Sequence, residues 1–532
     1  MLGCCCVVRR DGDLSWPLRR AAGVHGDVVG VTAGDRSLTY AELARHVGGL
    51  GAALAELEIP LGARVGLLGV NSLAHLECWL AVPAFGRVLV DLNFRLAEDE
   101  LAFMVEDAAV ELLVVDRDQL EVARALRERC PSLRQLVLDA PAPVPADCVV
   151  YEDLVARAPA APRGAEPDAL AAISYTGGTT GVPKGVMLSH GNLLANARHN
   201  LVATRHRQGD RFLHVCPMFH VAGTANLFAC TWVGAGQVVL PRFDAEAVLG
   251  AIERDRISHM VLVPTMLAML LAAPGFSTAD LSSLRNIQYA ASPIAPELQH
   301  RVLERFDCEI AQFYGMTEAS PTVSHLSPED HRLGFEGHEP QRTRLASMGV
   351  PVPGVEVEVR DHSGDALRAG EIGELWVRGP NIMLGYWNRP EADDAALVDG
   401  WYRSGDAGYA DPHGYLFMVD RLKDMIITGG ENVYCIEVEA ALTSHAAVLE
   451  AAVFGIPHEK WGESVHAVVT VAPGAELTQE DLIAHCRRSI GGFKLPCSID
   501  VQFEPLPKSG AGKVLKNRLR EPYWRGLERQ LG

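Results

Sequence analysis

A helix followed by a short apolar strand recurs along the first half of this chain, and that alternation limits the folds open to it. "SLTYAELARHVGGLGAALAEL" (Ser37 to Leu57) opens with polar residues and continues with apolar residues at helical spacing. "ARVGLLGV" (Ala63 to Val70) follows as a continuous apolar run of the length of a buried strand. "HLECWLAVPAFGRVLVDLN" repeats the theme, and "ELLVVD" adds another strand. The alternation predicts an α/β fold of doubly wound sheets.

The pattern changes after "DRLKD" (Asp420 to Asp424). "VLEAAVFGI", "ESVHAVVTVAPG" and "SIDVQFEP" alternate like strands and are interleaved with the helical "TQEDLIAHCRRSI". We therefore predict a large N-terminal domain over residues 1–420 and a smaller, mobile α+β domain over residues 421–532. The polar stretch from His325 to Arg344 predicts an irregular insertion with solvated histidines, because the spacing of His325, His331 and His338 matches no metal pattern.

Composition narrows the class of partner. The 532 residues are 48% hydrophobic and carry a formal charge of −19, which indicates a folded multidomain protein that repels nucleic acid. The twelve cysteines form no C-x-x-C pair, which disfavours a disulfide scaffold or a zinc site. No apolar segment reaches the roughly 20 residues of a membrane span, and the N-terminus has no export signal. We expect a cytoplasmic protein with a small-molecule substrate.

One glycine-rich stretch, "SYTGGTTGVPKGVMLSHGN" (Ser174 to Asn192), has the composition of a phosphate-binding loop. It is not a P-loop, because proline precedes the lysine and a strand, not a helix, follows it. The hydroxyls, the glycine backbone and the ammonium group are suited to phosphate oxygens. The candidate residues are Thr176, Gly177, Gly178, Thr179, Thr180, Gly181 and Lys184. Ser189 is expected to cap the next helix.

Further motifs follow in a fixed order: "PMFHVAG", "YAASPI", "QFYGMTEAS", "GYW", "WYRSGDAG", "DRLKDMIITGGENVY" and "PKSGAGK". Together with the glycine-rich loop, this set resembles the acyl-adenylate-forming superfamily of acyl-CoA synthetases, coumarate-CoA ligases, luciferases and peptide-synthetase adenylation domains. The resemblance spans about Ser37 to Arg520. It implies an AMP-forming acid–thiol ligase that uses ATP, Mg²⁺ and coenzyme A.

The resemblance also implies roles for single residues. The glycine-rich loop would hold the β- and γ-phosphates of ATP, Glu318 would ligate Mg²⁺, and Thr317 would bond to the α-phosphate. Asp406 would accept hydrogen bonds from the ribose hydroxyls and Arg421 would support it. Tyr314 would stack on adenine. The residues that would frame the nucleotide beside it are Ala290, Ala291, Ser292, Gln312 and Phe313.

Two elements of the C-terminal domain would serve the two half-reactions. Lys513, on a loop that glycines make mobile, would bring an ammonium group to the attacking carboxylate and the α-phosphate. Lys423 would be the hinge about which the domain rotates between adenylation and thioester formation. Gly429, Gly430 and Asn432 would then line the pantetheine tunnel.

The substrate pocket is expected to be apolar. "FHVAGTANLFA" holds no Asp or Glu to pair with an amino acid's ammonium group, which argues against amino acids. A hydrophobic carboxylic acid, whether fatty, aryl or polycyclic, is the fitting class. His220 is the predicted gate. The predicted pocket residues are Phe219, His220, Val221, Ala222, Gly223, Gly315 and Met316.

Three residues depart from the usual motifs, and they leave alternatives open. Gly178 removes a hydroxyl, Ala290 adds a methyl where glycine is usual, and Cys435 replaces a proline. Because a backbone position meant for close approach tolerates a Cβ poorly, Ala290 could weaken adenylation. The alternatives are thioester formation from a supplied adenylate, transfer to a carrier protein, or a non-catalytic binding relative. Only nineteen residues follow Lys513, which leaves no room for a carrier domain and favours free coenzyme A.

Overall fold

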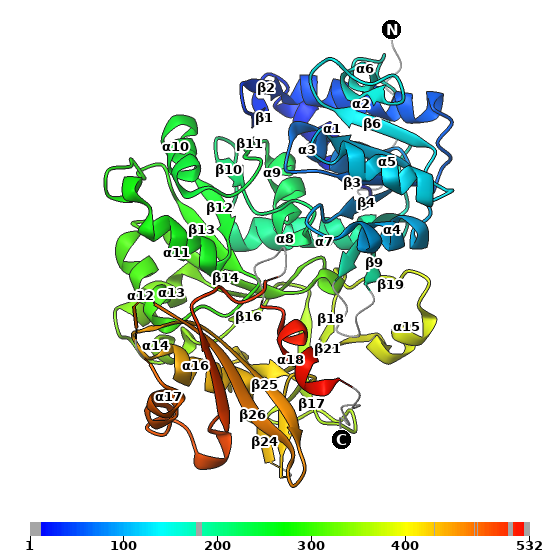
Figure 1. The fold of residues 1–532 in the computed structure, drawn as a ribbon. Helices are drawn as coiled ribbons and strands as arrows, with labels where there is room; N and C mark the ends of the chain where they lie inside the picture. Colours follow the sequence, from blue (N-terminus) through cyan, green and yellow to red (C-terminus); the bar gives the residue numbers. More distant parts are fainter. Residues whose placement is uncertain are drawn as a thin grey trace.

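The structure is a computed structural model that describes residues 12–176, 183–429, 431–472, 474–475, 477–508 and 514–525. It is a mixed α/β protein with a large N-terminal part and a smaller C-terminal part, as the alternation predicted (Figure 1). Four sheets make up the described fold. None of the described helices is long and apolar enough to cross a membrane.

The first large sheet has eight strands in the order β19-β9-β8-β4-β3-β5-β6-β7. Strands β4, β3, β5 and β6 pair in parallel, with helices connecting them as the sequence predicted. The strands are β3 (Arg64–Leu68), β4 (Val88–Leu92), β5 (Val110–Asp116), β6 (Gln135–Asp139), β7 (Val149–Val150), β8 (Leu170–Thr176), β9 (Lys184–Ser189) and β19 (Gly385–Tyr386). The accompanying helices are α2 (Tyr40–Glu56), α3 (Leu73–Ala84), α4 (Glu98–Asp107), α5 (Leu120–Arg129) and α6 (Tyr151–Val155).

The second large sheet has nine strands in the order β16-β15-β14-β13-β12-β10-β11-β1-β2. Strands β11, β10, β12, β13 and β14 are parallel, so their carboxyl ends share one edge and their amino ends the opposite edge. The strands are β1 (Val29–Ala33), β2 (Arg36–Thr39), β10 (Arg211–His214), β11 (Gly236–Val239), β12 (His259–Leu262), β13 (Asn286–Ala290), β14 (Glu309–Gly315), β15 (Thr322–Leu326) and β16 (Val350–Pro351).

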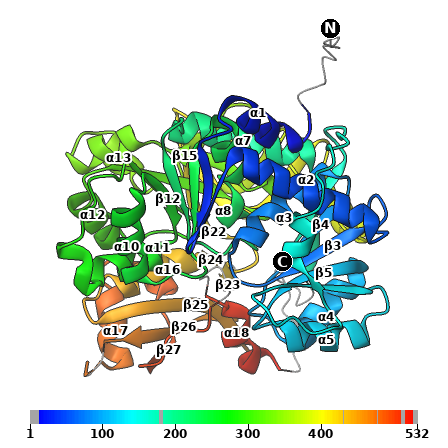
Figure 2. The ribbon, with the colours of Figure 1, turned by 90° about the horizontal axis from the view of Figure 1, so that it is seen from above.

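Helices cover this second sheet (Figures 1 and 2). Its strands run in both directions, since β14 pairs in parallel with β13 and antiparallel with β15. Residues of β10, β12 and β13 pack against α10, α11 and α12 in one hydrophobic cluster, while α2, α3, α7 and α9 contribute to the largest cluster. The helices are α1 (Ser15–Val24), α7 (His190–Thr204), α8 (Val221–Thr224), α9 (Leu227–Val233), α10 (Ala245–Asp255), α11 (Pro264–Ala272), α12 (Pro296–Arg305), α13 (Pro328–Phe335) and α14 (Gln341–Arg344).

A third sheet leads the chain to the C-terminal part. It contains β17 (Glu356–Arg360), β18 (Gly373–Arg378), β20 (Leu397–Val398), β21 (Trp401–Ala410) and β22 (Leu416–Arg421), and helix α15 (Pro390–Ala396) precedes β20. The predicted division at residues 420/421 falls at the end of β22, where a short loop leads to β23. That division, and the mobility of the smaller domain, stay predictions.

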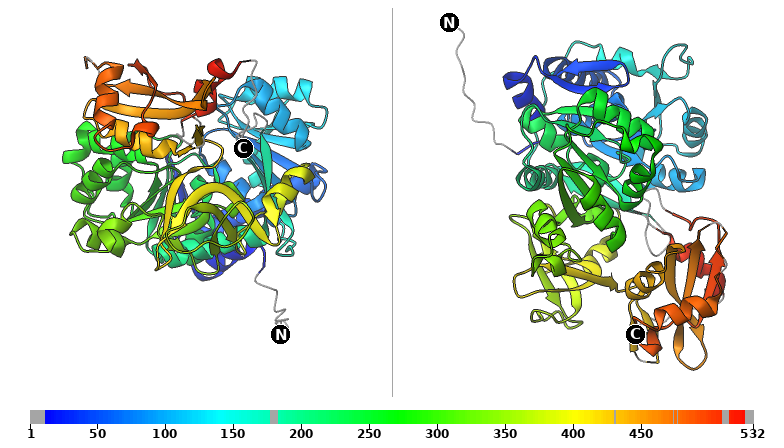
Figure 3. Two further views of the ribbon diagram at one scale, coloured as in Figure 1. Left: turned by 90° about the horizontal axis from the view of Figure 1, so that it is seen from below. Right: turned by 90° about the vertical axis from the view of Figure 1, so that its left-hand side faces the viewer.

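The C-terminal part has its own sheet and its own core of apolar residues (Figure 3). The sheet contains β23 (Ile426–Thr428), β24 (Glu431–Val433), β25 (Val448–His458), β26 (Gly462–Val471) and β27 (Ser498–Gln502). Helices α16 (Cys435–Thr443), α17 (Gln479–Cys486) and α18 (Lys516–Trp524) accompany it. Strand and helix thus mix along this part, which is the α+β pattern that the sequence predicted.

The prediction of solvated histidines in an irregular insertion was wrong for His331 and for His325, which lies in β15 with its Nε2 buried. The segment forms β15, α13 and α14, and the His331 side chain is buried in the described structure. Its Nε2 lies 3.0 Å from the Tyr289 hydroxyl and its Nδ1 lies 2.8 Å from the Ser327 carbonyl oxygen. The missed signal is Ser327, which caps α13 by accepting a hydrogen bond from the Asp330 backbone N–H. His338 is exposed, as predicted.

Ser189 caps α7, as the sequence predicted. Its hydroxyl accepts a hydrogen bond from the Asn192 N–H at 3.1 Å, and the Asn192 side chain accepts one from the Ser189 N–H at 2.9 Å. The Asn192 amide also donates to the carbonyl oxygens of Pro380 and Ile382. The cap therefore holds the strand that follows the glycine-rich loop against a segment far along the chain.

We expect Ser189→Ala to lower the free energy of unfolding by about 1 kcal/mol, because the N–H of Asn192 loses its acceptor. Urea-induced unfolding of the two proteins measures the difference. Ser363→Ala, in an exposed turn, is the matched control and should leave stability nearly unchanged. Equal stability of the two variants would contradict the capping role.

Candidate active site

Two predicted nucleotide-binding segments meet at the carboxyl edge of the nine-stranded sheet. β13 ends at Ala290 and its neighbour β14 ends at Gly315, and Ala290 pairs directly with Phe313. Because the two strands are parallel, the residues that follow each of them leave the sheet at the same edge. The structure therefore brings the "YAASPI" and "QFYGMTEAS" motifs side by side.

In the first motif, a residue with a positive φ follows Ala290 directly. Ala290 belongs to β13 and does not have a positive φ, whereas Ala291 has a φ of +76°. A left-handed conformation costs a residue with a Cβ about 1–2 kcal/mol. Strand pairing with Phe313 holds Ala290 in extended backbone, and the turn begins at Ala291. The weakening of adenylation by the Ala290 methyl group stays a prediction.

Tyr314 and Arg421 form a polar cluster around the buried carboxylate of Asp406. The Tyr314 hydroxyl donates to Asp406 Oδ2 at 2.7 Å, and Arg421 Nε lies 3.3 Å from Asp406 Oδ1. Strands β21 and β22 place Asp406 opposite Arg421, and β14 brings Tyr314 from the nine-stranded sheet. Burial, together with the Asp406 charge, raises the pKa of Tyr314, so its hydroxyl stays a donor. Each carboxylate oxygen keeps a further acceptor site.

Glu318 has a partner that the sequence did not suggest. It lies in the short 3₁₀ helix Thr317–Ala319, and its Oε1 accepts a hydrogen bond of 2.9 Å from the Tyr386 hydroxyl. The Lys184 ammonium group lies 4.9 Å from the centre of the same tyrosine ring. Burial and the Glu318 carboxylate raise the pKa of Tyr386. The structure thus groups Glu318 with Lys184 through Tyr386, whose only sequence signal was the "GYW" motif.

Lys423, the predicted hinge, lies in the loop between β22 and β23. Burial, followed by repulsion from the Arg421 guanidinium, lowers the pKa of Lys423 to about 8. Asp424, Asp406 and Glu318 act in the opposite direction. Lys423, the predicted hinge, therefore lies in the electrostatic field of the predicted nucleotide-binding residues.

The predicted acid pocket is lined by aromatic and small residues. The Phe219 ring lies 4.5 Å from the His220 ring and 5.4 Å from that of Phe94, between ring centres. A Cβ at Gly223 would lie 2.2 Å from the Pro217 carbonyl oxygen, and one at Gly315 would lie 1.6 Å from that of Pro321. Glycine is therefore required at both positions.

Positive charge next to this pocket was missed by the sequence analysis. The Arg95 guanidinium lies 5.4 Å from the Phe94 ring and 5.8 Å from the Phe219 ring, and that of Arg242 lies 5.5 Å from Phe94. Burial and the Arg242 charge lower the pKa of Arg95. No spacing rule links residues 95, 219 and 242, because they come from separate loops.

Other predicted residues lie apart from these clusters or outside the described residues. Gln312 accepts from the Tyr289 hydroxyl at 3.3 Å, and Thr176 ends β8. Gly429 and Asn432 belong to the β23–β24 hairpin of the C-terminal sheet. The remaining predicted residues of the acid pocket and of the nucleotide frame are among the described residues. They are Val221, Ala222, Ser292 and Met316. Outside the described residues lie Gly177, Gly178, Thr179, Thr180, Gly181, Gly430 and Lys513.

Comparison with known proteins identifies the family. Residues 18–387 match the family described as AMP-binding enzyme, and residues 437–513 match the AMP-binding enzyme C-terminal domain. The chain therefore belongs to the AMP-binding enzyme family and is a ligase of the acyl-adenylate-forming superfamily, as its motifs predicted.

Three relatives illustrate its similarities. A feruloyl-CoA synthase from Amycolatopsis is 38% identical over 97% of this chain and 100% of its own length. A fatty acid–[acyl-carrier-protein] ligase, ScoC from Streptomyces coeruleorubidus, is 35% identical over 92% of each chain. The solved amide bond synthetase McbA from Marinactinospora thermotolerans is 34% identical, with a TM-score of 0.86 over 96% of this chain and 100% of that one.

We expect Tyr386→Phe to raise the Mg²⁺ concentration needed for half-maximal adenylation by roughly tenfold, because loss of a partner that orients a metal ligand typically costs 10–100-fold. The measurement is a Mg²⁺ titration of exchange between pyrophosphate and ATP. Tyr409→Phe, whose ring stacks on Phe417, is the matched control. An unchanged Mg²⁺ requirement in Tyr386→Phe would contradict the orienting role.

The lowered pKa of Lys423 predicts that the free energy of unfolding rises with pH. Its pKa is about 8 in the folded chain and about 10.4 when unfolded, so between these values the unfolded chain binds more protons and stability rises with pH. We expect Lys423→Met to reduce the rise in unfolding free energy between about pH 8 and pH 10, measured by urea unfolding. Lys460→Met, an exposed control, should keep the wild-type rise. An equal rise in all three proteins would contradict the assignment.

Proposed function

We propose that this chain is an acyl-CoA ligase that activates a hydrophobic carboxylic acid with ATP and then forms its thioester with coenzyme A. The observation that carries the proposal is the Tyr314–Asp406–Arg421 cluster at the carboxyl edge of the nine-stranded sheet. A buried carboxylate held in place by two partners, with acceptor sites to spare, suits the two hydroxyls of a ribose.

In the first half-reaction, a carboxylate oxygen of the acid attacks the α-phosphorus of ATP, and the bond to pyrophosphate breaks. The acyl adenylate that forms has a good leaving group, which the free carboxylate lacks. Catalysis of such a step depends on positioning and on neutralising charge. Lys184, Thr317 and Lys513 are the residues proposed to supply donors and positive charge to the phosphates.

The donors around Glu318 fit a hard divalent cation. Tyr386 bonds to Oε1 only, which leaves Oε2 as an oxygen ligand of the kind that Mg²⁺ prefers. Glu318 would therefore hold Mg²⁺, which when bound supplies charge neutralisation to the phosphates. Tyr386 holds the carboxylate in one orientation, and the Lys184 ammonium group lies 4.9 Å from the centre of that ring.

In the second half-reaction, a thiol attacks the carbonyl carbon of the adenylate and AMP leaves. Coenzyme A carries several phosphates. Arg95 places positive charge beside Phe219, and Arg242 places it beside Phe94, where such an acceptor would be attracted. Lys423 would be the hinge for the change of domain position between the two steps. Gly429, Gly430 and Asn432 are proposed to line the path of the pantetheine arm.

The acid is proposed to be hydrophobic, with an aryl acid as the first candidate. Phe219, His220 and Phe94 offer ring faces and edges to a substrate, and aromatic pairs are favourable beyond the area they bury. The feruloyl-CoA synthase among the relatives supports this class. The acceptor of the acyl group is less constrained than the acid, because the relatives include a carrier-protein ligase and an amide bond synthetase.

We expect Lys513→Ala to slow acid-dependent exchange of labelled pyrophosphate into ATP by about 10²-fold or more, because a donor to developing charge is lost. The assay is run with fatty, aryl and polycyclic acids, so it identifies the acid that is activated as well as testing the adenylation step. Lys460→Ala, a lysine in another loop of the same part of the chain, is the control.

The acceptor is tested separately by supplying the acyl adenylate with coenzyme A, with an acyl-carrier protein or with an amine. Thioester formed with coenzyme A supports the proposal. Transfer to a carrier protein or an amine alone would replace the acceptor and keep the first half-reaction. Thioester formation without any pyrophosphate exchange would mean that adenylation has been lost, and Ala291→Gly would then be the variant to make.

A further inference from the structure

A second group of polar side chains lies at the opposite edge of the nine-stranded sheet from the candidate active site. His206 and Asp210 belong to the loop between α7 and β10, and His259 is the first residue of β12. All three are buried, with exposed fractions of 7%, 3% and 1%. One nitrogen or oxygen atom from each lies within 4.8 Å of those from the other two.

The hydrogen bonds of His206 define its protonation. Asn226 Nδ2 donates to Gln288 Oε1 at 3.0 Å, so Asn226 Oδ1 is the atom that faces His206. His206 Nε2 lies 2.9 Å from that oxygen and must therefore donate to it. His206 Nδ1 is then an unprotonated nitrogen, and it is buried without a hydrogen-bond partner among the described residues. A buried lone pair without a donor is costly unless something binds it.

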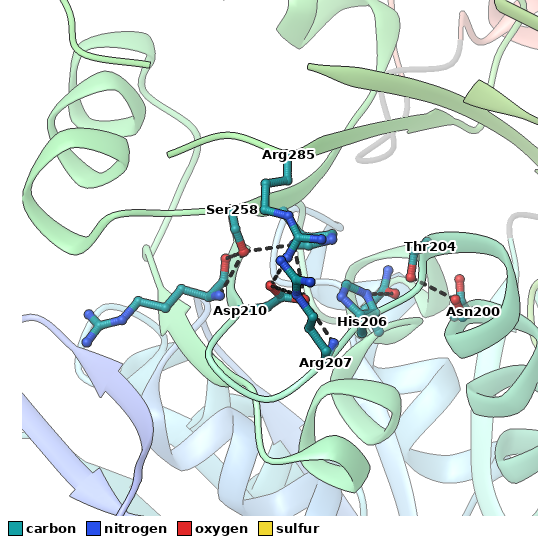
Figure 4. Close-up of polar contacts among 10 residues, drawn as sticks. Asn200, Thr204, His206, Arg207, Asp210, Ser258 and Arg285 are labelled. Carbon is teal, nitrogen blue, oxygen red and sulfur yellow. Dashed lines mark hydrogen bonds and ion pairs between the residues drawn. The ribbon is translucent and has the colours of Figure 1, made fainter. Parts of the chain in front are cut away.

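The other two side chains complete a compact set of ligand atoms. The His206 and His259 rings lie 4.5 Å apart between centres. His259 Nδ1 is 3.9 Å from Asp210 Oδ2 and 2.8 Å from Ser258 Oγ, a hydrogen-bond partner that a metal ion would displace. Figure 4 shows Asp210 between the side chains of Arg207 and Arg285, with His206 beside them. Asp210 accepts a hydrogen bond from the Arg207 N–H at 2.8 Å and forms an ion pair with Arg285.

We propose that His206, Asp210 and His259 form a binding site for a first-row divalent metal ion of the Zn²⁺ type. Two imidazoles and a carboxylate are a ligand set that such ions take, with a fourth position left for water. Asn226 plays the part of the outer partner that fixes the tautomer of a ligating histidine.

A metal ion has a route to this site. A hollow of about 600 Å³ opens beside it and is lined by His259, Thr204 and Arg285, among others. Arg285 competes with the metal, because its guanidinium already neutralises Asp210. Its side chain is 39% exposed and borders the hollow, so it has room to turn away when the ion binds. The ion would tie the loop after α7 to the start of β12, far from the nucleotide.

Because Arg285 competes with the metal for Asp210, substitutions of Arg285 and of the ligands should change metal affinity in opposite directions. The full chain, stripped with a chelator, is titrated with Zn²⁺ by calorimetry and with Co²⁺ by absorption spectroscopy. Asp210→Asn, His206→Gln and His259→Gln should each weaken binding at one site at least tenfold. Arg285→Gln should do the opposite and tighten it, because Asp210 loses the cation that competes with the metal.

Two controls separate this site from others. His199 is also buried with an unpartnered Nδ1, yet it belongs to no group of metal-ligand residues in the described chain, so His199→Gln should bind like the wild type. Cysteines are excluded by the Co²⁺ spectrum, which lacks thiolate charge-transfer bands at a His/Asp site. Near-ultraviolet circular dichroism of each stripped variant checks that it is folded. If a histidine variant does not fold, Asp210→Asn still tests the site, because asparagine has nearly the same shape as aspartate.

Equal metal binding by the wild type, the ligand variants and Arg285→Gln would overturn the proposal, as would the absence of any binding to the wild type. Loss of one site in the three ligand variants, with a gain in Arg285→Gln, would support it. Binding is the readout throughout, so the result does not depend on the proposed ligase reaction.

Discussion

A single buried carboxylate, that of Asp406, ties together the parts of the structure on which the site depends. It accepts a hydrogen bond from Tyr314 of the nine-stranded sheet and forms an ion pair with Arg421 of the third sheet. Arg421 is the last residue of β22, directly before the loop that holds the predicted hinge Lys423. A carboxylate that is only 4% exposed must have such partners, since an unpaired buried charge is very costly. The need to satisfy this charge fixes where the nucleotide-binding edge meets the start of the C-terminal part.

The charges around this carboxylate follow the chemistry proposed for the site. Glu318, held by Tyr386, supplies a hard oxygen, while Lys184 and Lys423 supply positive charge from two different directions. A reaction that transfers a nucleotide onto a carboxylate needs charges of both signs held in place before the substrates arrive. The proposed metal site at the opposite edge of the same sheet is separate from this arrangement and would stabilise the loop after α7.

Several structures with a local cause were predicted correctly from local signals in the sequence. The Ser189 cap, the strand after the glycine-rich loop and the loop position of Lys423 all depend on a few neighbouring residues. The burial of His331 was missed although Ser327 gave a capping signal, because burial depends on Tyr289, which comes from another strand. Strain at Ala291 was missed for a similar reason, since it depends on where strand pairing ends.

The sequence by itself determined the fold class and the family, because short motifs with their own local chemistry carry them. The same motifs supply the residues proposed to bind phosphate, ribose and metal. Only the tertiary structure decided which of them meet. Tyr386 reaches Glu318 across 68 positions, and Arg95 reaches Phe219 from the loop that follows β4 of the other large sheet. His206, Asp210 and His259 converge in the same way. Such contacts follow from the order of strands in the sheets, which leaves no mark on the spacing of residues along the chain.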